Sequence, residues 1–371
     1  MLKGKSEYYI AENHNQKRAI FHKDNPHEPL SGWWYNIYAH ELLEGKSECY
    51  IAENNNREKA IFHINNPTQP LTQWLDNIYG HAFLEGKSKY YIAQNQNKQL
   101  ALFDINQSQY PVSGWWKTIH AEQLLQGKSH YYLAKHQNGT LAIFHTNNPY
   151  QPISQWWNDI DPYGLIEGTS DYYIATNQES SKAIFHKDYP DEPLSNWHNY
   201  IYPFGLLNNT SEYYAVFSHR NHSIHFYHPN DMSKPLYQIS KVHEKSLLFF
   251  DYDYIIYVTK NNLVIHNNMY KKPDTIVPLP EDLRQNIFYI DYKEIPHYTM
   301  INSCTTNHLI TTYRRYNFIP IVYHINSKYE GYLYTLSGDY IGKFNNVQNM
   351  IEYMQQEIAK KNSSCDMLRL Y

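Results

Sequence analysis

Histidine is the residue type in this chain with the most scope for chemistry, because an imidazole binds transition metals and exchanges protons near neutral pH. Four of the 21 histidines recur at one position of a 41-residue period, where the third copy has an aspartate: His22, His63, Asp104, His145 and His186. Metal ligands lie about 2 Å from the ion, whereas neighbouring strands are about 4.7 Å apart and stacked sheets about 10 Å apart. Equivalent side chains of successive copies would rarely converge on one ion. We therefore expect polar strand ends here and no metal site.

Other catalytic constellations are absent from the sequence. It contains no GxSxG, GxxxxGK[ST], HExxH or GxGxxG motif, which are local signatures of hydrolases, phosphate-binding loops, metalloproteases and dinucleotide-binding folds. The three cysteines, Cys49, Cys304 and Cys365, show no CxxC spacing, and Cys49 stands where other copies have tyrosine. We expect a protein that is not an enzyme and that uses no cofactor.

The elements that must position these residues belong to a tandem repeat. Five clear copies of 41 residues follow one another without insertion or deletion, and two degenerate copies come after them. The copies span 4–44, 45–85, 86–126, 127–167 and 168–208, then 209–249 and 250–286. A fixed period between 20 and 50 residues is typical of solenoids, propellers and other arrays. We therefore predict a repeat array over 1–286 and a capping or small α+β region over 287–371.

Each copy reads as a β-hairpin followed by a loop and a third extended piece. In the first copy, SEYYIAEN and KRAIFHKD are rich in aromatic and β-branched residues and flank a polar turn. Pro26 and Pro29 end the second strand, because proline cannot donate to a sheet. The segment LSGWWYNIY then predicts the third extended piece. Near the C-terminus, GYLYTLSGDYIGKF predicts another hairpin, and Asn346 predicts the N-cap of a closing helix.

Both faces of the predicted strands are apolar. Tyr8 and Ile10 alternate with Tyr9 and Ala11, and all four positions stay mostly apolar in the first five copies. Strands covered on two sides fit sheets that stack on one another. The predicted fold is an all-β repeat array, with a β-propeller of about seven blades and a C-terminal helix as the first choice. An open β-solenoid is the alternative.

The order of residues within a copy resembles bacterial WG-type repeats over residues 1–207. A hairpin is followed by Pro29, an aromatic residue at Trp33 or Trp34, Ile37, a leucine pair and Gly45. The namesake Trp-Gly pair of the second strand is replaced by Ala-Ile-Phe, so the resemblance implies an arrangement and no catalytic residues. The final hairpin and amphipathic helix resemble the C-terminal end of SUKH-type immunity proteins.

Composition narrows the class of partner. Charged residues make up 18% of the chain, the formal net charge is −4 and there is no basic block, so the electrostatic footprint of a nucleic-acid-binding protein is missing. The sequence contains no run of 18 apolar residues, the length needed to span a bilayer. The N-terminal MLKGKSEYYI lacks the apolar core of a signal peptide. We expect a cytoplasmic protein with a protein partner, without nucleic-acid or membrane binding.

The aromatic pair of each copy supplies the candidate binding residues. Its first position is tryptophan in all five clear copies, which predicts a core residue. Its second position varies as Trp34, Leu75, Trp116, Trp157 and His198, as expected of a surface outside the tightly packed core. We expect Trp34, Trp116 and Trp157 to lie on one side of the array and, with His198, to contact a partner.

Three functions are compatible with these observations. A non-catalytic protein-binding or scaffold protein is the first, because near-identical copies supply a large surface and variable positions supply specificity. A toxin-neutralising immunity protein is a special case of it. An aromatic-rich glycan-binding protein is the third, and it is suggested by 38 tyrosines.

Overall fold

The structure is a computed structural model that describes residues 6–231, 234–242, 247–251, 253–259, 261–267, 274–279, 300–301, 318–325 and 328–367. Its contacts divide it into two compact units, Met1–Trp197 and His198–Tyr371. This division by contacts falls within the fifth copy. The predicted boundary at residue 286 separates recognisable copies from the rest of the sequence, and the residues on its C-terminal side, 287–299 and 302–317, lie outside the described residues.

A β-hairpin opens every clear copy, as predicted. Its strands pair antiparallel with the same register each time, for example Tyr9 with Phe21 and Ala11 with Ala19. The hairpins consist of β1 Tyr8–Glu12 and β2 Arg18–His22, β4 Cys49–Glu53 and β5 Lys59–His63, β7 Tyr90–Gln94 and β8 Leu100–Asp104, β10 Tyr131–Lys135 and β11 Leu141–His145, and β13 Tyr172–Thr176 and β14 Lys182–His186. A short 3-10 helix, η1 Ile105–Gln107, follows β8.

The third strand of a copy pairs with the hairpin of the next copy, which the sequence did not predict. The third strands are β3 Asn36–Tyr38, β6 Asn77–Tyr79, β9 Thr118–His120 and β12 Asp159–Asp161. They complete the sheets β3-β4-β5, β6-β7-β8, β9-β10-β11 and β12-β13-β14. The backbone N–H of Trp34 donates to Arg18 of its own copy at 2.9 Å, and that of Tyr35 donates to Glu53 of the next copy at 2.9 Å. One extended segment therefore joins two sheets.

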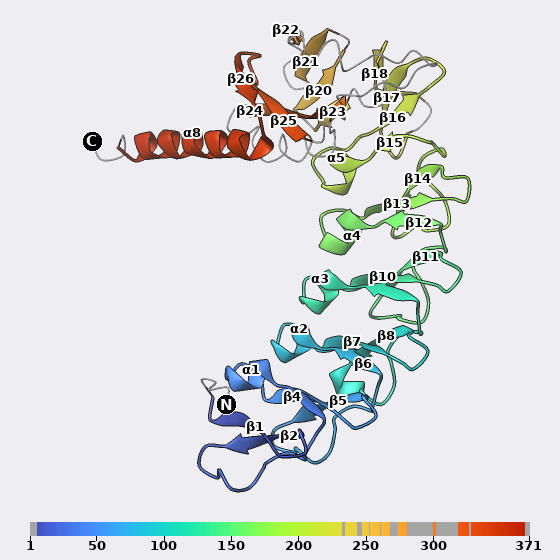
Figure 1. Ribbon diagram of the computed structural model, residues 1–371. Coiled ribbons are helices and arrows are strands. Elements are labelled where there is room, and N and C mark those ends of the chain that lie inside the picture. Colours follow the sequence, from blue (N-terminus) through green and yellow to red (C-terminus); the bar gives the residue numbers. More distant parts are fainter. Residues whose placement is uncertain are drawn as a thin grey trace. The chain divides into compact units, whose positions relative to one another are not determined.

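A single helical turn follows each third strand, in the segment that sequence reasoning left as a link. These helices are α1 His40–Leu43, α2 His81–Leu84, α3 Glu122–Leu125 and α4 Tyr163–Glu167. They lie on the same side of the successive sheets (Figure 1). Each turn is followed by a glycine with φ between 71° and 72°, at Gly45, Gly86, Gly127 and Gly168. Only glycine adopts this left-handed conformation at little cost, and it ends the helix.

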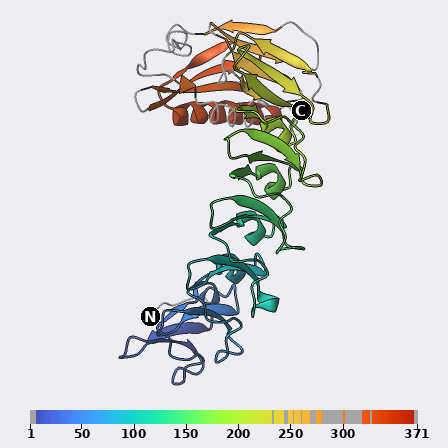
Figure 2. The ribbon, with the colours of Figure 1, turned by 90° about the vertical axis from the view of Figure 1, so that its right-hand side faces the viewer.

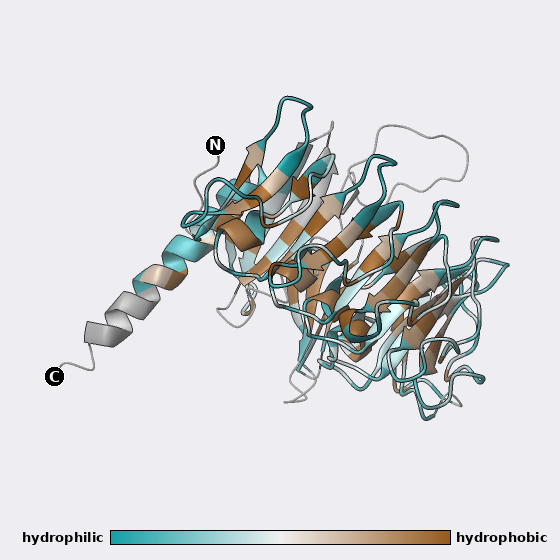
Figure 3. Ribbon diagram, turned by 90° about the horizontal axis from the view of Figure 1, so that it is seen from below, coloured by the Kyte–Doolittle hydropathy of each residue, from teal (hydrophilic) through white to brown (hydrophobic). Residues whose placement is uncertain are grey.

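The core of the first unit lies between consecutive sheets. The repeated alanine and the phenylalanine two positions on are buried in every clear copy, and Ala101 and Phe103 are fully buried. Each cluster combines two neighbouring copies, as where Ile20 of the first packs with Tyr50 and Phe62 of the second. The strands are hydrophobic and the hairpin turns hydrophilic (Figure 3), and the sheets of this unit follow one another in Figure 2. The predicted burial of both strand faces is confirmed.

The second unit begins with the end of the fifth copy and continues with two four-stranded antiparallel sheets. The first sheet consists of β15 Ile201–Tyr202, β16 Tyr214–Ser218, β17 Ser223–Tyr227 and β18 Tyr237–Ser240, with the helix α5 Phe204–Leu207 after β15. The second consists of β19 Leu247–Phe250, β20 Tyr254–Val258, β21 Asn262–Asn267 and β22 Thr275–Pro278. The hairpins predicted for the two degenerate copies are confirmed.

A last sheet and a helix close the described chain. The sheet contains β23 Met300–Ile301, β24 Phe318–Ile325, β25 Lys328–Thr335 and β26 Tyr340–Phe344, and the helix is α8 Val347–Met367. The predicted cap is confirmed, because Asn346 Oδ1 accepts from the backbone N–H of Asn349 at 2.7 Å. Met350 and Met354 of α8 are buried against Leu333 of β25. Small antiparallel sheets thus recur along the described part of the chain, as predicted for an all-β repeat array.

Candidate functional site

A groove of about 1110 Å³ lies beside the short helices of the first three copies. Its lining comes from equivalent places in successive copies, chiefly the third strands β3 and β6 and the helices α1 and α2, and it extends to Glu122 and Leu125 of α3. The groove belongs wholly to the first unit. A partner in it would contact more than one copy at once.

The local sequence explains why the groove is lined in this way. Leu42 and Leu84 anchor their helical turns in the core, being 1% and 7% exposed. A helical turn directs its residues to different sides, so the neighbouring positions His40, Glu41, His81 and Glu85 reach the groove. Ile37 and Ile78 add apolar surface from the third strands.

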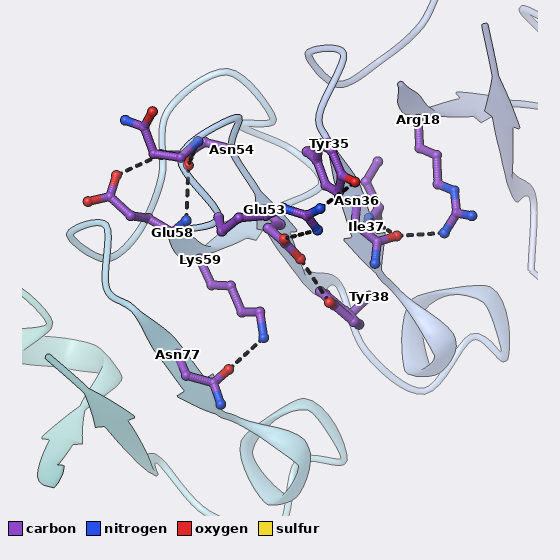
Figure 4. Close-up of polar contacts among 12 residues, drawn as sticks. Arg18, Tyr35, Asn36, Ile37, Tyr38, Glu53, Asn54, Glu58, Lys59 and Asn77 are labelled. Atoms are coloured by element: carbon purple, nitrogen blue, oxygen red, sulfur yellow. Dashed lines mark hydrogen bonds and ion pairs between the residues drawn. The ribbon is translucent and has the colours of Figure 1, made fainter. Parts of the chain in front are cut away.

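A polar network borders the groove where the first two copies meet (Figure 4). The Tyr38 hydroxyl donates to Glu53 Oε2 at 2.9 Å, and Arg57 donates to Glu53 Oε1 at 3.1 Å. Burial and the hydrogen bond to the Glu53 carboxylate raise the pKa of the Tyr38 phenol. The Arg57 guanidinium also lies 3.5 Å from the centre of the Tyr35 ring, a cation–π contact.

The charge of the groove is unbalanced. Its lining includes four carboxylates, two ammonium groups and two imidazoles: Glu41, Glu44, Glu85, Glu122, Lys59, Lys87, His40 and His81. Lys59 Nζ donates to Asn77 Oδ1 at 2.6 Å and Lys87 Nζ lies 2.7 Å from Glu85 Oε2. With neutral histidines the lining carries an excess of two negative charges, which favours a cationic group on the partner.

The repeated histidines have a structural role in the turn that follows β2 and its equivalents. Their Nδ1 atoms accept from the backbone N–H two residues later, at 3.2 Å for His22, 3.1 Å for His63, 3.0 Å for His145 and 3.2 Å for His186. Asp104 Oδ1 accepts the equivalent bond at 3.0 Å. The Nε2 of His22 lies 3.1 Å from Glu7 Oε2, and Asp104 instead meets Lys89 at 2.7 Å. These side chains therefore stabilise a turn, which explains why an aspartate can replace the histidine.

The predicted binding tryptophans lie between copies. Trp34, Trp116 and Trp157 are half-buried, and each contacts the buried phenylalanine of the next copy with centroids 5.1 to 5.3 Å apart. Their indole nitrogens are buried without a hydrogen-bond partner in the described part of the chain. Equivalent positions put them in the same place on successive copies, and none of them lines the groove.

The division of the aromatic pair into core and surface positions needs correction. Trp33, at the position predicted to be core, is 38% exposed, whereas Leu75, at the position predicted to be surface, is 6% exposed. Trp115 is half-buried, like Trp116. The remaining predicted residue, His198, is half-buried in the second unit, and burial lowers the pKa of its imidazole.

Sequence reasoning noted variation in the link between copies but placed the binding surface at the second aromatic, so it did not predict the groove that the link lines. One signal was present: the helix positions differ strongly between copies, with Glu41 replaced by Ala82, Gln123, Gly164 and Gly205. Variation of this size on a recurring backbone marks a surface that the fold itself does not dictate.

Comparison with known proteins adds little. No protein-family model and no curated protein matches the sequence. Similar solved structures include the C-terminal WD40 domain of Sif2, with 8% identity, 82% of each chain covered and a TM-score of 0.34. The WD40 β-propeller domain of Doa1 has 7% identity, 77% of this chain and 88% of that chain covered, and a TM-score of 0.28. Hsv2 of Kluyveromyces lactis has 8% identity, 78% and 90% covered, and a TM-score of 0.27. At such TM-scores no activity or partner is inferred. Within the described residues, no helix is long and apolar enough to cross a membrane.

Proposed function

We propose that the protein is a non-catalytic scaffold that binds an extended segment of a partner protein in the groove beside α1 and α2. The observation that carries this proposal is the continuous groove of about 1110 Å³ lined by three successive copies. Pockets of this size are large enough to hold several side chains.

The lining specifies the chemistry of the partner segment. Ile37, Ile78 and Leu125 offer apolar surface, which favours aliphatic or aromatic side chains on the partner. The excess of carboxylates around them favours a lysine or arginine beside those side chains. Tyr38 and Tyr79, 42% and 49% exposed, add the kind of aromatic surface that is enriched at protein interfaces.

The repeat supplies a matched pair of variants to test this. Ala82→Trp fills the groove from α2, whereas Gln123→Trp changes the equivalent residue of the next copy, which does not line it. We expect a protein captured from lysate by the wild-type chain to be lost with Ala82→Trp and retained with Gln123→Trp. Both variants should unfold at similar denaturant concentrations. If both variants retain the partner equally, the partner does not bind in the groove. If the chain binds to a glycan array and captures no protein partner, the proposed scaffold function is wrong.

The tryptophan surface is a second candidate contact. Trp34, Trp116 and Trp157 are only half-buried at equivalent positions. Replacing the three by leucine, the natural residue at position 75, preserves an apolar contact between copies. Loss of the captured partner in this variant, with His198 unchanged, would assign the interface to the tryptophans. Identification of that partner as a toxin would favour the immunity function.

A further inference from the structure

Glu41 is a buried carboxylate at a position that does not require one. It is 5% exposed, and the equivalent residues of the following copies are Ala82, Gln123, Gly164 and Gly205. The fold accepts small or neutral residues there, whereas burying a charge is costly unless it is paired or binds a cation. We therefore ask whether the Glu41 carboxylate binds a cation.

The described neighbours of Glu41 satisfy it incompletely. Its Oε1 lies 3.1 Å from His40 Nδ1, but its Oε2 is buried and has no hydrogen-bond partner among the described residues. Lys46 Nζ forms an ion pair with Oε2 at 3.7 Å, which is too far for a hydrogen bond. This lysine also recurs as Lys87 and Lys128, in copies with no acidic residue at the position of Glu41. Lys46 thus belongs to the repeat and does not account for Glu41.

Two side chains of the next copy complete a constellation. One ligand atom each from Glu41, His81 and Glu85 lies within 4.8 Å of the other two. His81 Nε2 and Glu85 Oε1 are 3.4 Å apart, one helical turn from each other. Lys87 contacts Glu85 through Oε2 at 2.7 Å, so the Oε1 atom stays directed to His81.

We propose that Glu41, His81 and Glu85 bind a divalent first-row transition metal such as Zn²⁺ where the first two copies meet. One imidazole and two carboxylates are ligands that Zn²⁺ accepts, and water completes the coordination. Tetrahedral ligands at about 2.1 Å from zinc are about 3.4 Å apart, so the atoms must approach by roughly 1 Å. The His81 side chain is 77% exposed and can turn to do so.

This site is separate from the histidine column. Its three residues also line the groove, so a bound divalent ion would offset the negative charge there, but binding of the ion itself requires no protein partner. The next junction carries Ala82, Glu122 and Gln126 at the equivalent positions and has lost two of the three ligands. The chain thus contains its own metal-free counterpart.

The test uses the full chain, stripped of metal with a chelator, and titrated with Zn²⁺ by calorimetry and with Co²⁺ by visible absorption. We expect the chain to bind one equivalent of Zn²⁺ tightly. The visible spectrum of the Co²⁺-bound chain should indicate one imidazole ligand. His81→Ala and Glu41→Ala should each lower the affinity for Zn²⁺ by more than about tenfold, since even the loss of a residue that only supports a metal ligand lowers metal affinity 10- to 100-fold. The exposed control variant His27→Ala should bind like the wild type.

Stability provides a readout that does not depend on counting ions. Zn²⁺ should raise the melting temperature of the wild type and His27→Ala but not of Glu41→Ala. Without metal, Glu41→Ala should be at least as stable as the wild type, because it removes a buried charge and restores the residue found at Ala82. If the wild type does not bind one Zn²⁺ tightly, or if His81→Ala and Glu41→Ala bind Zn²⁺ with the same affinity as the wild type, the proposed site is wrong.

Discussion

The ring of Trp34 packs against that of Trp74 in the next copy, with centroids 5.4 Å apart and planes tilted by 53°. The same contact recurs between Trp116 and Trp156 at 5.4 Å and between Trp157 and Trp197 at 5.4 Å. The second aromatic of one copy therefore covers the first aromatic of the following one. In such an array, the contact between neighbours contributes much of the stability.

Trp116→Ala should destabilise the protein by about 2–4 kcal/mol, somewhat below the range for a fully buried aromatic, because the ring is only half-buried. Trp116→Leu should cost less, since Leu75 fills the equivalent place. Urea unfolding followed by tryptophan fluorescence and circular dichroism measures both. A cost below about 0.5 kcal/mol for Trp116→Ala, typical of surface substitutions, would show that the contact between copies is unimportant.

Ser113→Ala should destabilise the protein by about 1–3 kcal/mol, the cost of an unsatisfied buried polar group. Ser113 is 1% exposed, and its Oγ accepts from the backbone N–H of Leu102 at 2.9 Å. Thr72 makes the same bond to Ile61 at 3.0 Å, so Ser113→Thr should be much closer to the wild type. If chemical denaturation finds the two variants equally stable, this hydrogen bond does not hold the loop on the strand.

Raising the pH above about 10 should destabilise the protein through its buried tyrosines. Burial raises the pKa of Tyr91, Tyr132 and Tyr173 above the ordinary value, and raises that of Tyr214 to about 12. The folded state then keeps phenol protons that the unfolded chain loses first. The contribution is fully present below the unfolded pKa and is lost as the pH rises toward the folded pKa. Unfolding midpoints at pH 8 and pH 10.5 measure the loss.

Tyr91→Phe and Tyr132→Phe distinguish this effect from general charge repulsion. The Tyr91 hydroxyl is buried without a hydrogen-bond partner among the described residues, so its removal should be neutral or stabilising at pH 8 and should reduce the alkaline loss. The Tyr132 hydroxyl donates to the Pro149 carbonyl at 3.0 Å, so its removal should cost about 1 kcal/mol at pH 8. An unchanged alkaline loss in both variants would assign it to other groups.

Deleting residues 86–126 tests whether the array closes into a ring. The deletion joins Glu85 to Gly127 and recreates a normal junction. Packing in the first unit runs between consecutive copies, and we therefore expect a folded product with a cooperative melting transition. A closed propeller would lose a blade, so collapse of the melting transition would favour the ring.

The hairpins and the burial of both strand faces could be predicted from the sequence, but the strand pairing between copies and the one-turn helices could not. The hairpin of Tyr8–Glu12 and Arg18–His22 follows from residue pattern and turn chemistry within about 15 residues. The pairing of Asn36 with Glu53 depends on the next copy, which no local pattern states. The one-turn helices were not predicted because they are short and because Ala39 and Gly80, at their N-caps, make no side-chain cap.

The candidate site was less predictable than the fold. A half-buried tryptophan at a junction has the same sequence signature as an exposed one, so Trp34 was expected on the surface for want of information about its neighbours. Glu41 differs, because the sequence shows it as an acidic exception at its repeat position. Only the structure shows that it is buried and that His81 lies beside it.

Because each third strand pairs with the hairpin of the next copy, one 41-residue copy of the sequence does not correspond to one sheet. The sheets β3-β4-β5, β6-β7-β8, β9-β10-β11 and β12-β13-β14 each take one edge strand from the copy before. Because the period is fixed at 41 residues, a gene duplication or loss of 41 codons within these copies leaves the remaining sheets complete, wherever in the period it starts. Unequal recombination could therefore lengthen or shorten the array without first breaking it, while single positions such as Glu41 diverge in one copy alone.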